Sequence, residues 1–409
     1  MPILGSQGST KGPSTAPTIG TATAGNANAS VTFTAPSFSK LPITSYTITS
    51  NPGGFTGTGS SSPITVSGLT NGTAYTFTVT ATHANGVSSA SSASNSITPI
   101  APKFGYYAGG IRPKGGTPYS STITKFSMEA ETSSNLSATL TATTYGLNGS
   151  GMANSGTAGY FGGGIDASAG TAVSRIDKVT FVNDSKSTLA AALLNTKAYM
   201  TGLANSGTAG FFYGGKQGST FIYDRDRVIF SNDSRSSATD YLSTPAFHSG
   251  FANSGTAGYL AGGNDNNNSY WSVSTIFKIT FSSDARSTLG ATLTQKTFSA
   301  TGFANSGTAG YSAGGGDNNG SYLAVLDKIT FSNDSKSTLA STLSVARTSL
   351  SSFANSGTAG YIFGGGSAAA SSVSTIDKLT FSNDSRTTLG TGLIRELTEL
   401  GAFANSGTL

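Results

Sequence analysis

The sequence predicts an all-β protein in two parts, a small antiparallel sandwich followed by a closed ring of six four-stranded repeats. Short segments of alternating apolar and polar residues lie between glycine and proline turns, as in antiparallel sheets. The pentapeptide Ala-Asn-Ser-Gly-Thr recurs six times at intervals of about 50 residues, which indicates a repeat architecture. No segment has the apolar periodicity of a long amphipathic helix. The chain, at 409 residues, is also longer than one ordinary domain.

Composition and charge limit the chemistry of this chain. The absence of cysteine excludes disulfides and thiolate metal sites. The net charge of +5 is spread through the repeats, where a Lys or Arg recurs at one strand position and a second basic residue follows a turn aspartate. We expect these charges to form solvated scaffold pairs worth about 0–1 kcal/mol each. No nucleic-acid partner is expected, because that would require a one-sided basic stripe.

Residues 1–13 are predicted to be a docking segment. They are rich in Gly and Ser and contain neither the basic start nor the long apolar run of a signal peptide. No stretch of the chain is apolar enough to span a membrane, so we expect neither ordinary export nor membrane insertion. Since such a terminus does not hold a fixed shape by itself, we expect Met1, Pro2, Ile3 and Leu4 to contact a partner protein.

Residues 14–99 contain none of the repeat and are predicted to form the sandwich. Strand patterns occupy residues 30–34, 43–48 and 75–80. The segment from Leu69 to Ala81, followed by Asn-Gly-Val-Ser, resembles the second half of a fibronectin type III domain. The resemblance implies that the Tyr75 hydroxyl ties the chain to an upstream backbone group. It also implies a spacer or adhesion role.

Residues 100–409 are predicted to be a β-propeller. In the fifth full repeat, the expected strands are residues 351–355, 360–364, 375–381 and 388–393, with a hairpin turn at Ser-Gly-Thr after the first. Four short strands in about 50 residues are typical of a propeller blade. The aromatic residue and double glycine of the second strand resemble the Kelch repeat, which implies a Kelch-like propeller.

The two ends of the repeat region predict ring closure. The first repeat begins at Tyr106 without a preceding pentapeptide, and the sequence ends at Leu409 just after an unpartnered one. We therefore expect residues 400–406 to pair with residues 104–109 as the innermost strand of the first blade. The apolar residue before each pentapeptide should then form a buried ring, namely Met152, Leu203, Phe251, Phe303, Phe353 and Phe403.

The candidate binding site lies on the loops that differ between repeats. Strand alternation places the loops between second and third strands, and the connections between blades, on one face. Aromatic rings stack on the apolar faces of sugars, and amides and carboxylates bind the hydroxyls, so we expect glycan binding there. The candidates are Trp271, Tyr270, Tyr322, Tyr223, Tyr119, Asp265 and Asp317. The Asp- and Asn-rich loops lack the ligand spacing of a calcium loop and favour turns, so neither metal nor cofactor is expected.

A fibronectin-like module joined to repeats rich in Gly and Ser, without cysteine, resembles virion proteins of tailed bacteriophages, particularly cyanophages. The resemblance implies a non-enzymatic tail fibre or capsid-attached fibre that is made in the host cytoplasm and located in the virion. Its N-terminal segment would dock on other virion subunits, and its propeller would meet a host glycan or receptor. A bacterial cell-surface adhesion protein is the first alternative. A glycan-processing enzyme is less favoured, because glutamate is confined to four positions.

Overall fold

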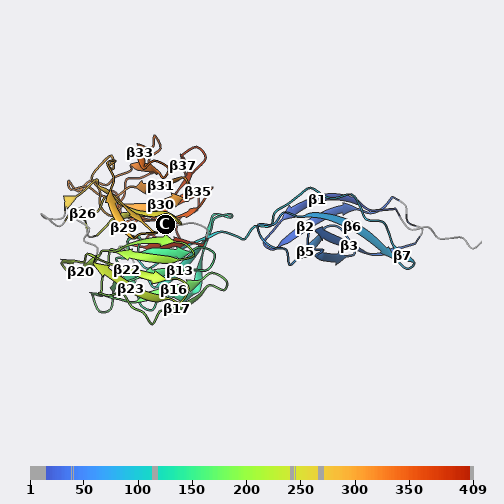
Figure 1. The fold of residues 1–409 in the computed structure, drawn as a ribbon, viewed down its shortest axis with the longest axis horizontal. Helices are drawn as coiled ribbons and strands as arrows, with labels where there is room; N and C mark the ends of the chain where they lie inside the picture. The colour runs from blue at the N-terminus through green and yellow to red at the C-terminus, as the bar shows by residue number, and fades with distance from the viewer. Residues whose placement is uncertain are drawn as a thin grey trace, which may run out of the picture. The chain divides into compact units, whose positions relative to one another are not determined.

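The computed structural model describes residues 15–37, 39, 41–112, 118–239, 244, 246–265 and 271–405. Every regular element in these ranges is a β-strand, which confirms the all-β prediction (Figure 1). The chain divides into two compact units, Met1–Pro102 and Lys103–Leu409, here called the N-terminal and C-terminal units. The described residues contain no helix that is long and apolar enough to cross a membrane.

The N-terminal unit is a sandwich of two antiparallel sheets around one core. One sheet has the order β1-β2-β5, with β1 (Thr18–Ala24), β2 (Asn28–Thr34) and β5 (Ile64–Ser67). The other has the order β4-β3-β6-β7, with β4 (Thr56–Gly59), β3 (Ile43–Asn51), β6 (Thr76–His83) and β7 (Gly86–Val87). The Tyr75 hydroxyl accepts a 3.1 Å hydrogen bond from the Thr70 backbone N–H, so the predicted tyrosine corner is confirmed.

The C-terminal unit contains six four-stranded antiparallel sheets, here numbered I to VI. Sheet I consists of β38 (Gly401–Ala404), β8 (Phe104–Ala108), β9 (Thr122–Ser127) and β10 (Thr132–Thr139). Sheet II consists of β12 (Gly151–Asn154), β13 (Ala158–Gly162), β16 (Ile176–Thr180) and β17 (Ser185–Thr188). Sheet III consists of β18 (Thr201–Asn205), β19 (Ala209–Tyr213), β22 (Asp224–Ile229) and β23 (Ser234–Thr239).

The remaining sheets repeat this pattern. Sheet IV consists of β24 (Ser249–Asn253), β25 (Ala257–Ala261), β28 (Ile276–Thr280) and β29 (Ala285–Thr288). Sheet V consists of β30 (Thr301–Asn305), β31 (Ala309–Ala313), β32 (Leu326–Thr330) and β33 (Ser335–Thr338). Sheet VI consists of β34 (Ser351–Asn355), β35 (Ala359–Phe363), β36 (Ile376–Thr380) and β37 (Ser385–Thr388). Short strands in the loops are β11 (Thr144–Tyr145), β14 (Ile165–Asp166), β15 (Thr171–Ala172), β20 (Lys216–Gln217), β21 (Thr220–Phe221), β26 (Asn264–Asp265) and β27 (Trp271–Ser272).

The fourth strand of sheet VI differs from the prediction. In sheet VI it is β37, which ends at Thr388, where the predicted strand begins. The preceding turn ends at Asp384, whose positive φ of 52° reverses the chain so that pairing starts at once between Ser385 and Thr380. The apolar pattern that predicted residues 388–393 comes from leucines in the connection after the strand, where Leu393 is buried in the core.

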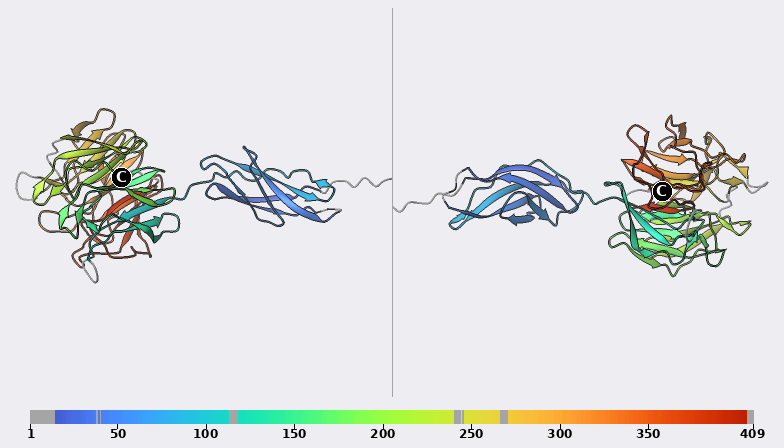
Figure 2. Two further views of the ribbon diagram at one scale, coloured as in Figure 1. Left: turned by 90° about the horizontal axis from the view of Figure 1, so that it is seen from below. Right: turned by 180° about the vertical axis from the view of Figure 1, so that it is seen from behind.

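The C-terminal strand pairs with the first strand of the C-terminal unit. β38 lies antiparallel to β8, with Gly401 opposite Ala108 and Ala404 opposite Gly105. Both views in Figure 2 show the end of the chain, marked C, within the C-terminal unit. This pairing confirms the prediction for residues 401–404; residues 406–409 lie outside the described part. The first strands of successive sheets contact one another in the order β12, β18, β24, β30, β34 and β38, and β38 in turn contacts β12.

The apolar residues that precede the repeated pentapeptides are buried, as predicted: Met152, Leu203, Phe251, Phe303, Phe353 and Phe403 are at most 1% exposed. Each packs against the glycine of the Ala-Gly or Phe-Gly pair in the following sheet. A Cβ on Gly360 would collide with the Phe303 ring, and one on Gly105 would collide with the Phe353 ring. Close packing between neighbouring sheets therefore explains why the repeat keeps a glycine before its aromatic residue.

The repeated Asn-Ser-Gly-Thr turns hydrogen-bond to one another. Asn305 Oδ1 accepts a 2.8 Å bond from the Gly357 N–H of the next sheet, and Ser306 N–H donates to Ser356 Oγ at 3.0 Å. The same Asn–Gly bond joins Asn154 to Gly207, Asn205 to Gly255, and Asn253 to Gly307. The uniformity of these turns thus has a structural cause, because each turn serves as both donor and acceptor for its neighbours.

A second contact between sheets involves the turn aspartates. Asp334 of sheet V accepts hydrogen bonds from Tyr259 Oη at 2.8 Å and from Lys278 Nζ at 2.6 Å, both in sheet IV. Equivalent ion pairs are Lys125–Asp184, Lys178–Asp233, Arg227–Asp284, Lys328–Asp384 and, between sheets VI and I, Lys378–Glu131. The predicted ion pairs form, but they join neighbouring sheets, and their side chains are only 18–35% exposed rather than fully solvated.

Candidate functional site

The loops between second and third strands meet the connections between sheets on one side of the C-terminal unit, here called the variable face. The double glycine that follows the second strand joins the variable loop to the connection between sheets. Gly315 N–H donates to Arg347 O at 2.9 Å, and Gly263 N–H donates to Thr297 O at 2.8 Å. Gly314 and Gly315 both have positive φ, at 66° and 101°, which is the conformation that glycine adopts without strain. The double glycine therefore fixes the variable loops of sheets I, II, IV, V and VI against the connection that follows each sheet.

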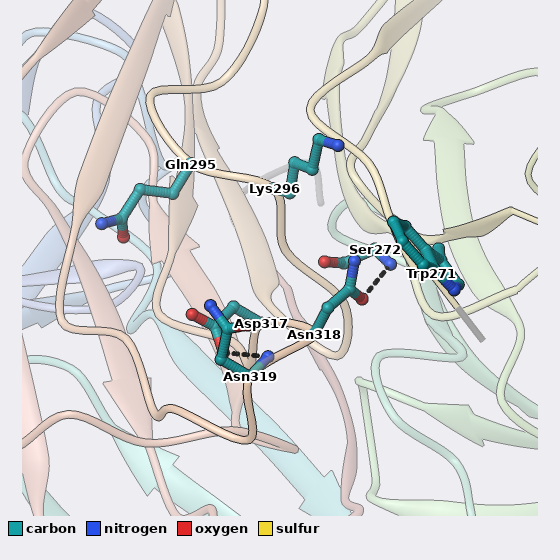
Figure 3. Close-up of a pocket in the computed structure, with 7 residues that line it drawn as sticks. All are labelled: Trp271, Ser272, Gln295, Lys296, Asp317, Asn318 and Asn319. Carbon is teal, nitrogen blue, oxygen red and sulfur yellow. Dashed lines mark hydrogen bonds between the residues drawn. The ribbon is translucent and has the colours of Figure 1, made fainter. Parts of the chain in front are cut away.

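A pocket of about 570 Å³ opens on the variable face between loops of sheets IV and V. Its lining residues are Trp271, Ser272, Gln295, Lys296, Asp317, Asn318 and Asn319 (Figure 3). Trp271, the only tryptophan of the sequence, is 55% exposed, which is unusual for this residue type. A large exposed ring beside several polar groups is typical of a ligand-binding surface.

Hydrogen bonds hold the polar side of the pocket in place. Asn318 Oδ1 accepts a bond from the Ser272 N–H and so joins the loops of sheets V and IV (Figure 3). Asp317 Oδ1 accepts bonds from Ser321 N–H at 2.8 Å and Asn319 N–H at 2.9 Å. The bond from Ser321, followed by that from Asn319, holds the pKa of Asp317 below its usual value. The carboxylate is therefore ionised at neutral pH and already oriented.

The pocket presents an aromatic face, a carboxylate, two amides from asparagine and one from glutamine, and one ammonium group. The face of an indole ring binds apolar C–H surfaces, while amides and carboxylates accept and donate hydrogen bonds to hydroxyls. Trp271 starts β27 and is paired across the loop hairpin with Asp265 of β26, which fixes the strand position of the ring. This combination suits a polyhydroxylated ligand such as a saccharide.

The structure brings only some of the predicted residues together. Trp271 and Asp317 line the pocket, whereas the side chain of Asp265 does not. Tyr322, which is 37% exposed, and the half-buried Tyr223 lie elsewhere on the variable face. Tyr119 stacks on Tyr145 with ring centroids 4.7 Å apart, in the loops of sheet I. Tyr270 and the docking residues Met1, Pro2, Ile3 and Leu4 lie outside the described part of the chain.

Five pocket residues are not among the candidates named from the sequence: Ser272, Gln295, Lys296, Asn318 and Asn319. Gln295 and Lys296 belong to the connection between sheets IV and V rather than to a loop between second and third strands. Gln295 and Lys296 could have been found from the topology, because the connections between sheets lie on the same face as the variable loops. Their sequence, which is polar and differs from repeat to repeat, pointed the same way.

The Asp317–Asn319 segment forms a turn, as the sequence predicts. Both hydrogen bonds to Asp317 Oδ1 come from backbone N–H groups within its own loop. Within the described residues, no three His, Asp or Glu side chains lie close enough together to hold a metal ion.

Comparisons with known proteins bear on each unit separately. The model of the fibronectin type III domain matches residues 15–97. These residues form a fibronectin type III domain. No curated protein matches the chain. Among solved structures, that of YjhT is similar, with 15% identity and a TM-score of 0.53, over 66% of this chain and 91% of that chain. At this identity the similarity concerns the β-rich fold alone.

Proposed function

We propose that this chain is a non-enzymatic structural protein of a bacteriophage particle, a tail fibre or capsid-attached fibre, that binds a glycan of the host surface. In this proposal the C-terminal unit is a closed six-bladed, Kelch-like β-propeller. The observation that carries the binding function is the pocket on the variable face, in which exposed Trp271 lies beside Asp317 and Asn318.

Four independent contacts support the closed propeller. Sheet VI reaches sheet I through the Lys378–Glu131 ion pair and through the packing of Phe353 on Gly105. The first strands of sheets VI and I, β34 and β38, contact each other. The Tyr361 hydroxyl donates to the Met128 carbonyl at 3.3 Å across the same junction. The first three contacts have counterparts between sheets IV and V, namely Lys278–Asp334, Phe251 on Gly310, and β24 beside β30. The fourth differs in its acceptor, because Tyr259 donates to Asp334.

The division between two faces supports a display role. The side chains of the uniform turns hydrogen-bond to neighbouring turns, as Asn305 does with Gly357. The pocket residues, by contrast, leave a large aromatic ring and a charged ammonium group open to solvent. Binding residues are commonly carried by variable loops on a rigid scaffold.

The phage assignment rests on the resemblance of this sequence to virion proteins of tailed bacteriophages. The fibronectin type III domain serves as a spacer, and the segment before it would dock on other virion subunits. Antibody labelling of purified phage particles tests this directly. Label on the virion is expected, whereas label on the surface of uninfected bacteria would favour the alternative of a bacterial adhesion protein.

Binding of the full chain to a glycan panel and to host cells tests the pocket. We expect Trp271→Ala to weaken binding by roughly thirtyfold or more, because the loss of one aromatic hot spot costs about 2 kcal/mol or more. Asn319→Ala should also weaken it, by a smaller factor. Val182→Ala is the matched control, since Val182 is 88% exposed in a turn on the opposite face. Unchanged binding by Trp271→Ala, with a normal melting temperature, would contradict the assignment.

A further inference from the structure

Sheet III contains a buried lysine beside two carboxylates. Lys197, in the connection between sheets II and III, contacts Asp224 and Asp226, the first and third residues of β22. The side chains of Lys197 and Asp226 are fully buried, and that of Asp224 is only 4% exposed. Since residues two apart in a strand face the same way, both carboxylates lie on one side of β22, toward the lysine.

The two carboxylates have different partners. Asp224 Oδ1 accepts a hydrogen bond from Lys197 Nζ, and Asp224 Oδ2 accepts one from Asn195 Nδ2 at 2.6 Å. Asp226 Oδ1 accepts a 3.2 Å hydrogen bond from Arg235 Nη1, which provides a cation of its own. Asp226 Oδ2 lies 2.8 Å from Lys197 Nζ and makes no hydrogen bond, so it can accept a proton from that nitrogen.

The equivalent cluster in sheet VI has neither the lysine nor the second carboxylate. Arg347 takes the place of the lysine, and its Nη2 lies 2.6 Å from Asp377 Oδ2. Thr375 takes the place of Asp224, and its backbone carbonyl accepts a 3.0 Å hydrogen bond from Arg347. An arginine and one carboxylate therefore suffice for the structural link at this position. The Lys–Asp pair of sheet III calls for a chemical explanation instead.

We propose that Lys197 and Asp224 form an intramolecular isopeptide bond, an amide between Nζ of the lysine and Cγ of the aspartate. Charged groups are unfavourable where water is excluded, so the ammonium proton passes to Asp224 Oδ1 and leaves a neutral amine against a neutral carboxyl group. The nitrogen then bonds to Cγ, and Asp226 Oδ2 accepts the proton that the nitrogen loses. Asn195 stabilises the negative charge that develops on Asp224 Oδ2.

The second half of the reaction releases water. The proton on Asp226 passes to the Oδ1 hydroxyl of Asp224, the bond between Cγ and Oδ1 breaks, and one water molecule leaves. The reaction consumes nothing else, and the fold itself holds the reacting groups in contact. The amide joins residues 27 positions apart and ties the connection before sheet III to the third strand of that sheet. It constrains the unfolded chain and does not depend on glycan binding at Trp271.

Trypsin digestion of the purified full chain, unfolded in urea, tests the bond by mass spectrometry. Trypsin does not cleave after an amidated lysine, so we expect residues 187–216 to remain intact at Lys197 and to be joined to residues 217–225. The mass of this branched product should be one water lower than the sum of the two peptides. Lys328 is the internal control, since its ion pair with Asp384 is partly exposed and cleavage after it should be normal.

Two variants test the roles of the individual groups. Lys197→Arg copies the arginine of sheet VI and should fold with residues 217–225 unlinked. Asp226→Asn keeps the size of the side chain but cannot accept the proton, and it should leave most of the chain unlinked, because general-base catalysis contributes roughly a hundredfold or more in rate.

Three results would count against the proposal. Wild-type peptides that end mainly at Lys197 would overturn it. A branch on residues 226–227 in place of residues 217–225 would overturn the choice of Asp224 as acceptor. An undiminished branched product from a folded Asp226→Asn chain would overturn the role of Asp226.

Discussion

Asn405 Oδ1 accepts a 2.8 Å hydrogen bond from the Phe104 backbone N–H, although the two residues are 301 positions apart in sequence. The Asn405 N–H in turn donates to the Phe104 carbonyl at 2.9 Å. This reciprocal pair continues the ladder between β38 and β8. The first sheet of the C-terminal unit is therefore completed by the end of the chain.

Deletion of residues 398–409 should destabilise the C-terminal unit by several kcal/mol. The deletion removes Phe403, whose ring contacts Tyr106 and Phe161, and truncation of one buried Phe alone costs about 3–5 kcal/mol. It also leaves an unpaired edge on β8. Thermal unfolding followed by circular dichroism measures the effect. A control deletion of residues 1–13 should leave this transition unchanged, and an unchanged melting temperature after the C-terminal deletion would contradict closure.

Gly360→Ala should destabilise the protein by about 1–3 kcal/mol, because the new methyl group would collide with the Phe303 ring of the previous sheet. Gly390→Ala, in the same repeat, is the matched control. A Cβ at Gly390 meets nothing within 4 Å, so this variant should change stability by less than about 0.5 kcal/mol. Urea denaturation distinguishes the two, and equal effects would argue against the packing of Phe303 on Gly360.

Tyr259→Phe should cost about 1 kcal/mol, because it removes the hydroxyl that donates to Asp334 in the next sheet at 2.8 Å. The ring itself would remain in the core. Tyr322→Phe is the control, since Tyr322 is exposed and should tolerate the same change. The difference in unfolding free energy between the two variants measures the bond between sheets, and no difference would show that this bond contributes nothing.

Stability should depend on pH through two groups that act in opposite directions. Burial raises the pKa of Glu399 to about 7, so the folded state holds a proton that the unfolded state loses, and this contribution falls as pH rises from about 4.5 to 7. Burial lowers the pKa of His248 to about 4, so its contribution rises with pH from about 4 to 6.5. In the wild-type chain these effects oppose each other below pH 6.5.

Glu399→Gln should separate the two contributions. As pH rises from 4.5 to 6.5, the free energy of unfolding of the variant should increase, because His248 contributes and Glu399 no longer opposes it. At pH 8, where the buried carboxyl of the wild-type chain is charged, the variant should be more stable than the wild type. Urea denaturation at pH 5, 6.5 and 8 measures both effects. If the difference between variant and wild type is the same at pH 5 and pH 8, Glu399 does not titrate as described.

Local patterns predicted much of the fold. The first three strands of each repeat followed from alternation and from the Gly-containing turn, and the Tyr75 corner followed from its resemblance to fibronectin domains. The fourth strand failed because β37 is a polar edge strand, while the apolar signal came from Leu389 and Leu393 beyond it. Edge strands carry little apolar pattern, so their ends cannot be placed by periodicity.

Contacts between repeats could not be predicted in the same way. The bond from Tyr259 to Asp334 joins residues 75 positions apart, and only the packing of sheet IV on sheet V shows that they meet. The same limit applies to the candidate sites. Trp271 was found because it is a single tryptophan in a variable loop, whereas Lys296 lies in a connection whose closeness to that loop depends on the packing of sheet IV on sheet V.

Zero-length cross-linking of the native chain tests the proposed closure most directly. A carbodiimide joins a lysine ammonium to a carboxylate only when the two groups touch, and Lys378 and Glu131 form the ion pair between sheets VI and I. The pairs Lys125–Asp184 and Lys328–Asp384, with separations of 2.7 and 2.6 Å, serve as internal controls. A closed ring predicts that mass spectrometry finds the Lys378–Glu131 peptide at a yield similar to the controls. Control cross-links without the Lys378–Glu131 product would contradict it.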